Sequence, residues 1–132
     1  MSKMALFQCG EFVLHSGEVS DFKIDCDALT ADDWEALAYM IGDRVGRFSR
    51  VVGIPRGGWK LAEAMRPLTG SATDPVLIVD DVLTTGRSME DTRQAMIATG
   101  ETLPIKGAVV FARGLVPAWI TPLFTLTPIR RT

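Results

Sequence analysis

The sequence has few of the residues that form disulfides or bind structural metals. Its 132 residues include two cysteines, Cys9 and Cys26, and one histidine. This count excludes a disulfide-dense secreted scaffold and gives none of the usual metal-ligand spacings, so we expect both thiols to be reduced and inert. No apolar segment approaches the roughly 20 residues of a membrane-spanning helix, and no signal-like stretch follows Met1. We therefore expect a cytoplasmic protein with no membrane partner.

The chain also has little excess of one charge over the other. The chain carries 14 Lys and Arg against 16 Asp and Glu, which gives a formal net charge of -2. A dedicated nucleic-acid binder has a strongly basic surface, so the balance excludes that class and leaves room for a local phosphate site. The length and the 47% hydrophobic content are typical of one domain with one core. We expect a single domain over residues 1–132.

The first third of the chain predicts a cap followed by a helix. Turn residues interrupt the short extended runs between residues 5 and 27, so residues 1–29 are expected to lie outside the core sheet. Thr30 has the features of a helix N-cap, and apolar residues then recur at helical spacing until Gly46, with Trp34 in the core. Four further helical positions are expected to fill the core, namely Met40, Met65, Met89 and Met96.

Residues 30–115 predict an α/β core. Short apolar strands at 50–54, 76–80 and 107–112 alternate with helices at 59–65 and 89–99, a pattern typical of a parallel sheet covered on both faces. Ligands bind such sheets at the carboxyl ends of the strands. Residues 116–132 contain three prolines and predict a C-terminal loop with one edge strand near 123–126.

The most informative stretch is residues 76–88, VLIVDDVLTTGRS. An apolar strand brings Asp80 and Asp81 to its carboxyl end, and the turn that follows opens a helix. The backbone N–H groups, hydroxyls and positive helix end of such a turn can surround one phosphate. Paired carboxylates suit vicinal hydroxyls or a hydrated metal ion. The two features together indicate a ligand laid out like a ribose 5-phosphate.

These 13 residues resemble the phosphoribosyl pyrophosphate (PRPP) binding motif of the type I phosphoribosyltransferases. The resemblance implies a Rossmann-like parallel sheet flanked by helices, with a small N-terminal hood. It implies that Asp80 and Asp81 are the catalytic pair, which holds the ribose hydroxyls and orders Mg²⁺ through water. The residues it assigns to the 5-phosphate are Thr84, Thr85, Gly86, Arg87 and Ser88.

A second loop, residues 53–58, follows the first core strand and resembles the pyrophosphate loop of the same family. Glycine lets the backbone approach a diphosphate closely, and arginine adds positive charge beside the leaving group. The resemblance assigns pyrophosphate binding to Arg56, Gly57 and Gly58.

The N-terminal run around residues 12–20 resembles the hood of the orotate phosphoribosyltransferases. It makes His15, Ser16 and Gly17 candidates for contacting the base. Orotate enzymes usually have a lysine and an arginine at two positions where this chain has His15 and Glu90. An acidic Glu90 is expected to repel an anionic base.

The resemblance implies a pentosyltransferase that moves ribose 5-phosphate from PRPP to a nucleobase-like acceptor, with orotate or another pyrimidine as candidates, and that forms a homodimer. A non-catalytic PRPP or nucleotide sensor is the alternative. Only 17 residues separate Gly58 from Val76, where family members commonly hold an extra strand and a mobile loop. A receiver-like or phosphatase-like domain is a third alternative, disfavoured because no aspartate follows Asp91.

Overall fold

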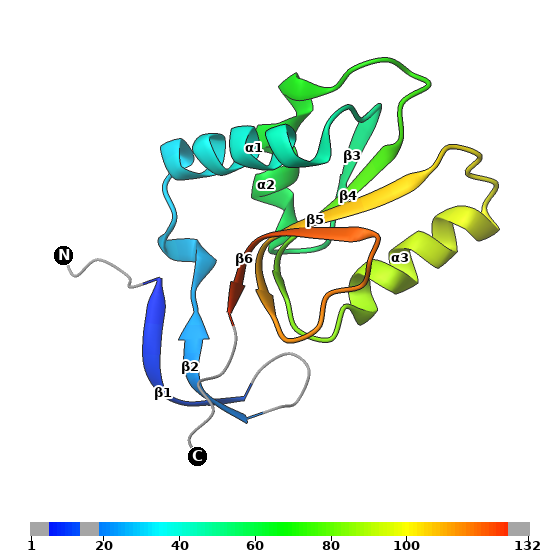
Figure 1. The fold of residues 1–132 in the computed structure, drawn as a ribbon. Coiled ribbons are helices and arrows are strands. Elements are labelled where there is room, and N and C mark those ends of the chain that lie inside the picture. Colours follow the sequence, from blue (N-terminus) through cyan, green and yellow to red (C-terminus); the bar gives the residue numbers. More distant parts are fainter. Residues whose placement is uncertain (1–5, 14–18, 127–132) are drawn as a thin grey trace.

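The computed structural model describes residues 6–13 and 19–126, so the candidates His15, Ser16 and Gly17 lie outside the described residues. The described chain begins with an antiparallel hairpin of β1 (Phe7–Val13) and β2 (Val19–Ile24) (Figure 1). These two strands form a sheet of their own, apart from the main sheet. The expected cap outside the core sheet is confirmed. A short 3-10 helix, η1 (Cys26–Ala28), connects it to the core.

The core is a parallel sheet with the strand order β3-β4-β5-β6. Its strands are β3 (Arg50–Gly53), β4 (Val76–Leu83), β5 (Ile105–Arg113) and β6 (Ile120–Leu126). Residues 76–79 of β4 are fully buried, as expected for an apolar run with a covered face on each side. The predicted α/β fold with a parallel sheet is confirmed.

Helices cover both faces of this sheet (Figure 1). α1 (Ala31–Val45) and α2 (Gly58–Met65) pack against the strand side chains on one face of the sheet. α3 (Arg87–Ala98) packs against those on the other face. α1 begins where the sequence predicts, because Thr30 and Asp33 form a reciprocal capping box. None of the helices in the described part of the chain is long and apolar enough to cross a membrane.

Most of the predicted core residues are buried. Trp34 is 5% exposed, Met65 and Met89 are almost fully buried, and Met96 packs against the core on the α3 side. The prediction for Met40 is wrong, because its side chain is 42% exposed. Ala38 and Ile41 face the core from α1, and each residue of a helix is rotated by about 100° from the last, which turns Met40 outward.

The last strand is longer than the predicted edge strand. β6 begins at Ile120 and contains Pro122, which an edge position tolerates because its outer side needs no N–H donor. Arg44 of α1 donates to the carbonyl oxygens of Pro122 and Leu123, each at 3.2 Å. The arginine thereby satisfies two carbonyl groups of the edge strand.

β5 and β6 are joined by only six residues, 114–119, although parallel strands are usually connected by a longer crossover. We call these residues the return segment. It passes beside the start of α3, where Pro117 approaches Gly86. At its other end the carbonyl oxygen of Trp119 accepts a hydrogen bond from the backbone N–H of Gly107 at 2.9 Å. The return segment therefore takes the place of a crossover helix.

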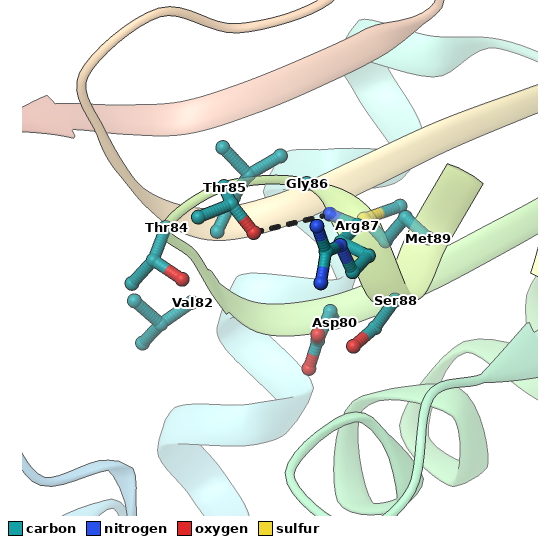
Figure 2. A pocket seen from close by; sticks show the side chains of 9 residues that line it. Asp80, Val82, Thr84, Thr85, Gly86, Arg87, Ser88 and Met89 are labelled. Carbon is teal, nitrogen blue, oxygen red and sulfur yellow. Dashed lines mark hydrogen bonds between the residues drawn. The ribbon is translucent and has the colours of Figure 1, made fainter. Parts of the chain in front are cut away.

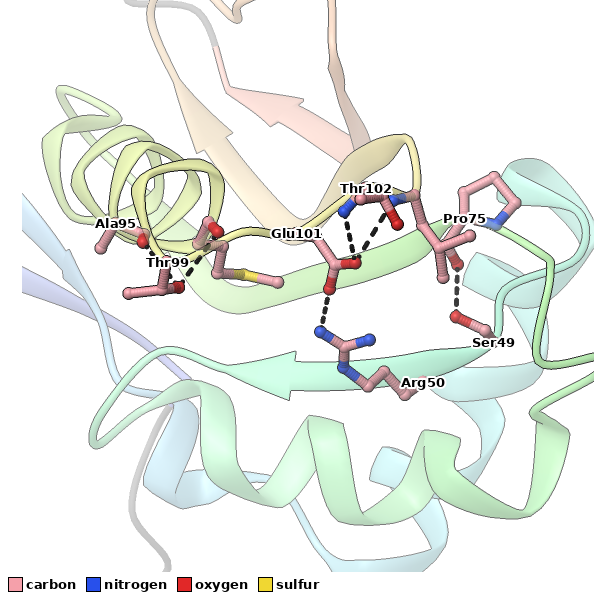
Figure 3. Close-up of polar contacts among 9 residues, drawn as sticks. Ser49, Arg50, Pro75, Ala95, Thr99, Glu101 and Thr102 are labelled. Carbon is pink, nitrogen blue, oxygen red and sulfur yellow. Dashed lines mark hydrogen bonds and ion pairs between the residues drawn. The ribbon is translucent and has the colours of Figure 1, made fainter.

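Polar contacts join the elements at the amino-terminal edge of the sheet (Figure 3). Arg50 of β3 forms an ion pair with Glu101, and the Ser49 hydroxyl donates to the Pro75 carbonyl oxygen at 3.4 Å. Gly70 donates its N–H to the carbonyl oxygen of Phe48 at 2.8 Å. The interval between α2 and β4 contains η2 (Arg66–Leu68) and a turn but no strand, and its turn lies at this edge.

The burial of α2 yields a stability prediction. Leu61 is fully buried between α2 and the sheet, whereas Leu115 in the return segment is 95% exposed. Leu61→Ala is expected to lower the free energy of unfolding by about 2–5 kcal/mol, and the matched Leu115→Ala control by less than about 0.5 kcal/mol. Urea denaturation measures both, and equal losses would contradict the described packing.

Candidate functional site

Two loops meet at the carboxyl edge of the sheet, one after β3 and one after β4. β4 extends beyond its predicted end at Asp80 to Leu83, so Asp81 also lies in the strand, between residues that pair with β5. Successive side chains of a strand point to opposite faces. Asp80 accordingly lines the hollow on the α3 side, while Asp81 lies against the loop that follows β3. The pair therefore connects two separate pieces of the site.

Asp80 is an acid with a raised pKa. Burial first, and then the neighbouring Asp81 carboxyl, raise its pKa from 3.8 to about 8. The Asp81 N–H donates to the Asp80 carboxylate at 2.8 Å, which lowers the pKa and only partly offsets this rise. In the ligand-free protein Asp80 therefore keeps its proton to a much higher pH than an exposed aspartate does.

Asp81 is packed between the N-terminal cap and the loop after β3. A Cβ added to Gly57 would lie 2.3 Å from one carboxylate oxygen of Asp81. On its other side is Cys26 of η1, a buried thiol whose pKa is raised to about 12 by burial and by the nearby Asp81 carboxylate, with which it also forms a hydrogen bond. Cys26 is thus part of the surroundings of the site, a placement that its position in the sequence does not signal.

The turn after β4 forms the second piece. The hollow it surrounds is partly open to solvent and is lined by Asp80 and residues 82–89. In Figure 2 the side chains of Asp80, Arg87 and Ser88 point to the same side. Gly86 adopts the left-handed conformation (φ 80°) that starts α3, and the Arg87 N–H donates to the Thr85 hydroxyl at 3.3 Å.

The first turn of α3 is suited to an anion. The initial N–H groups of a helix have no partner within the helix, and the helix dipole is positive at this end. Arg87 and Ser88 are exposed, which leaves their side chains accessible to a ligand. All five residues predicted to bind the 5-phosphate line the hollow, namely Thr84, Thr85, Gly86, Arg87 and Ser88.

The loop after β3 is packed directly on β4. A Cβ on Gly58 would lie 2.6 Å from the carbonyl oxygen of Val79, and one on Gly53 would lie 2.7 Å from the carbonyl oxygen of Gly58. Such distances leave no room for any side chain. Arg56 is exposed next to this close packing, and the Pro55–Arg56 peptide bond is cis. The loop thus presents exposed backbone and one arginine beside Asp81.

The structure therefore brings together three of the four predicted groups: the carboxylate pair, the turn after β4 and the loop after β3. Among residues 6–13 and 19–126, no group of three or more His, Cys, Asp or Glu side chains could hold a metal ion by itself. A cation at this edge would need ligands from a substrate or from water in addition to the two aspartates.

The raised pKa of Asp80 predicts a pH-dependent stability. The folded protein keeps the Asp80 proton up to about pH 8, whereas the unfolded chain loses it near pH 4. The stability that the protonated Asp80 contributes to the folded state is therefore fully present below about pH 4 and is lost as the pH rises through 8. Asp80→Asn is expected to raise the free energy of unfolding by at least about 1 kcal/mol at pH 8.5 and to have little effect at pH 4.

Thermal denaturation at the two pH values checks this expectation. Asp91→Asn, a change of the same chemistry at an exposed position of α3, is the matched control. A gain in stability from Asp80→Asn that is equal at pH 4 and pH 8.5 would contradict the burial of a proton at this site.

The sequence matches no protein-family model and no curated protein. Solved structures do resemble the fold. Orotate phosphoribosyltransferase from Aeropyrum pernix is 20% identical with a TM-score of 0.71, over 91% of this chain and 88% of that one. Xanthine-guanine-hypoxanthine phosphoribosyltransferase from Helicobacter pylori is 16% identical with a TM-score of 0.51, over 70% and 85%. A hypothetical protein from Neisseria gonorrhoeae with bound ppGpp is 18% identical with a TM-score of 0.54, over 75% and 82%.

Two of these three solved structures are phosphoribosyltransferases, and they differ in the base named in their descriptions. The match to the Aeropyrum pernix enzyme includes about nine tenths of each chain. The chain has the fold of the type I phosphoribosyltransferases.

Proposed function

We propose that the protein is a phosphoribosyltransferase that moves ribose 5-phosphate from PRPP to a ring nitrogen of a nucleobase-like acceptor and releases pyrophosphate. The observation that carries this proposal is the seating of Asp81 against Gly57. It leaves the carboxylate pair between the hollow at the start of α3 on one side and a glycine loop with an exposed arginine on the other. PRPP has the same order of groups, a 5-phosphate, two ribose hydroxyls and a diphosphate.

In this proposal the side chains act by position and charge. The turn after β4 holds the 5-phosphate, and Asp80 and Asp81 accept hydrogen bonds from the ribose hydroxyls. Arg56 and the backbone of Gly57 and Gly58 stabilise the negative charge that develops on the diphosphate as its bond to the anomeric carbon breaks. A bond to the acceptor nitrogen forms at the same carbon. Holding both reactants in line supplies much of the rate acceleration.

Magnesium is the cation that this donor set fits. Mg²⁺ prefers oxygen ligands, retains several waters and binds through one or two carboxylates together with substrate phosphates. Asp80 and Asp81 supply carboxylates, and the absence of a larger cluster among residues 6–13 and 19–126 agrees with a cation that arrives with its substrate. When bound, the ion would neutralise charge on the diphosphate.

A nucleotide or PRPP sensor is the second candidate. The interval from α2 to β4 lies partly at the amino-terminal edge of the sheet, opposite the site, so its turn does not cover the bound ribose. Closure over a reacting centre normally excludes water. The similar fold of the Neisseria gonorrhoeae protein, whose description names bound ppGpp, supports a nucleotide ligand for this alternative.

Pyrophosphate release separates the two candidates. The protein is incubated with Mg²⁺, PRPP and a panel of bases that includes orotate, uracil, xanthine and guanine. We expect release with at least one base, and we expect Asp80→Asn/Asp81→Asn to reduce it by at least about 100-fold, because the ribose and cation contacts act only through these two side chains.

The same panel is paired with calorimetric titrations of PRPP and ppGpp. Binding of either ligand, with no pyrophosphate released from PRPP in the presence of any base of the panel, would reject the transferase in favour of the sensor. Failure to bind PRPP at all would reject both the transferase and a PRPP sensor, and would leave ppGpp binding as the only support for a nucleotide sensor.

The titration of Asp80 predicts how PRPP affinity varies with pH. Below about pH 8 the free protein must lose the Asp80 proton before this carboxylate can face a cation. The affinity for PRPP with Mg²⁺ is therefore expected to fall by up to about tenfold for each pH unit between 8 and 6.5. Asp80→Asn removes the part of this dependence that belongs to the protein, so identical pH profiles for both proteins would contradict the assignment.

A further inference from the structure

Three side chains form a cluster behind the turn that follows β4. Glu90 and Arg93 lie on α3, and Trp119 ends the return segment. We call them the Glu90 cluster. They are not part of the hollow, whose lining ends at Met89. Their contacts join α3 to the return segment, two elements that no strand pairing connects.

Glu90 is the acceptor of the cluster. Its carboxylate accepts hydrogen bonds from Gln94 at 2.9 Å and from Arg93 at 3.1 Å. The bond from Gln94 and the charge of Arg93 lower the pKa of Glu90, and a hydrogen bond from the Trp119 side chain lowers it further. The carboxylate is thus ionised and accepts hydrogen bonds from two donors of its own helix, Gln94 and Arg93.

Arg93 and Trp119 form the other half of the cluster. The Arg93 guanidinium lies over the Trp119 ring, with its central carbon 5.2 Å from the ring centre, a cation–π geometry. Trp119 is in turn fixed by the sheet, since its ring would contact a Cβ at Gly107 at 2.9 Å. Contact with Trp119, which packs on β5, therefore helps to fix the position of Arg93. Arg93 in turn donates a hydrogen bond to Glu90.

The cluster acts on the same helical turn that surrounds the hollow. The backbone N–H of Glu90 donates to the carbonyl oxygen of Gly86 at 3.0 Å, the regular bond of the first turn of α3, so the Glu90 side chain is attached one turn after the glycine that starts the helix. Pro117, two residues before Trp119, approaches Gly86 from the return segment. The start of α3 thus lies beside the return segment, to which Arg93 also connects the helix through Trp119.

We propose that Glu90 is a positioning residue of the 5-phosphate site, acting with Arg93 and Trp119 to hold Gly86, Arg87 and Ser88 in their binding arrangement. The proposal rests on the proposed function for the identity of the phosphate ligand. It also offers an alternative to the expectation that Glu90 repels an anionic base, because this carboxylate accepts hydrogen bonds from Gln94 and Arg93 of its own helix. The choice of acceptor then depends on other residues.

Two conservative variants test this role. Glu90→Gln removes the charge that pairs with Arg93, and Trp119→Phe keeps an aromatic ring but removes the indole donor. The matched control is Glu101→Gln, which breaks the ion pair with Arg50 at the opposite edge of the sheet. The measurements are steady-state kinetics with PRPP and titration with inorganic phosphate, and both are repeated for the double variant Glu90→Gln/Trp119→Phe.

Each of the two variants is expected to raise the KM for PRPP and the Kd for inorganic phosphate by about three- to tenfold, the effect of losing one or two hydrogen bonds. The kcat, the KM for the acceptor and the ratio of rates between anionic and neutral bases are expected to stay unchanged. The double variant should lose no more than the larger single loss, because the residues act as a unit. Glu101→Gln should change none of these values.

A change in the KM for the acceptor or in the selectivity between orotate and uracil in Glu90→Gln would overturn the proposal, because it would place Glu90 at the base. An unchanged phosphate affinity in both variants would overturn it as well.

Hydrogen exchange of the ligand-free protein tests the role even if PRPP is not the ligand. The backbone amides of residues 85–88 are expected to exchange faster in Glu90→Gln and Trp119→Phe than in the wild type and in Glu101→Gln. Unchanged exchange in these amides would reject the positioning role, whereas failure of PRPP to bind the wild type would reject only the proposed function.

Discussion

The contact between Asp81 and Gly57 is the constraint on which the site depends. The carboxylate occupies the space that any side chain at position 57 would need, and a Cβ at Gly58 would lie only 2.6 Å from the Val79 carbonyl oxygen. Two loops that are more than 20 residues apart in the sequence thereby form one continuous surface. Neither loop would present its groups to the same ligand if the glycines were replaced.

The two edges of the sheet divide stability from ligand binding. At the amino-terminal edge the ion pair of Arg50 with Glu101, and the hydrogen bond from Lys106 to the carbonyl oxygen of Val45, join strands to loops. At the carboxyl edge two half-buried carboxyl groups lie side by side, and burial and mutual repulsion raise the pKa of Asp80. A pKa shifted in this way is typical of functional sites. The fold tolerates its cost because the rest of the core is well packed.

The sequence predicted those features that depend on local patterns. The capping box at Thr30, the alternation of strands and helices, and the glycine turn before α3 all follow from residues close together in the chain. Predictions failed or were missing where distant segments meet. Nothing near Cys26 indicates that η1 brings its thiol to Asp81, and nothing in the proline-rich tail indicates that six residues run back along α3.

The extent of β4 shows the same limit. Aspartate is a poor strand former, so the local pattern ends the strand at Asp80, yet pairing with β5 continues to Leu83 and keeps Asp81 in the strand. The faces of Asp80 and Asp81 could be predicted only once the strand was known to continue. Assigning Glu90 likewise required the return segment, because its role depends on Trp119, 29 positions later in the chain.

The proton on Asp80 has a consequence for any cation that binds at this edge. At neutral pH the arriving charge must expel that proton into the solvent, so binding and proton release are a single event. The heat of binding then contains the ionisation enthalpy of whichever buffer takes up the proton. Titrations in buffers of different ionisation enthalpy would differ in apparent heat while agreeing in affinity. The slope of the apparent heat plotted against the ionisation enthalpy of the buffer would give the number of protons that leave the site.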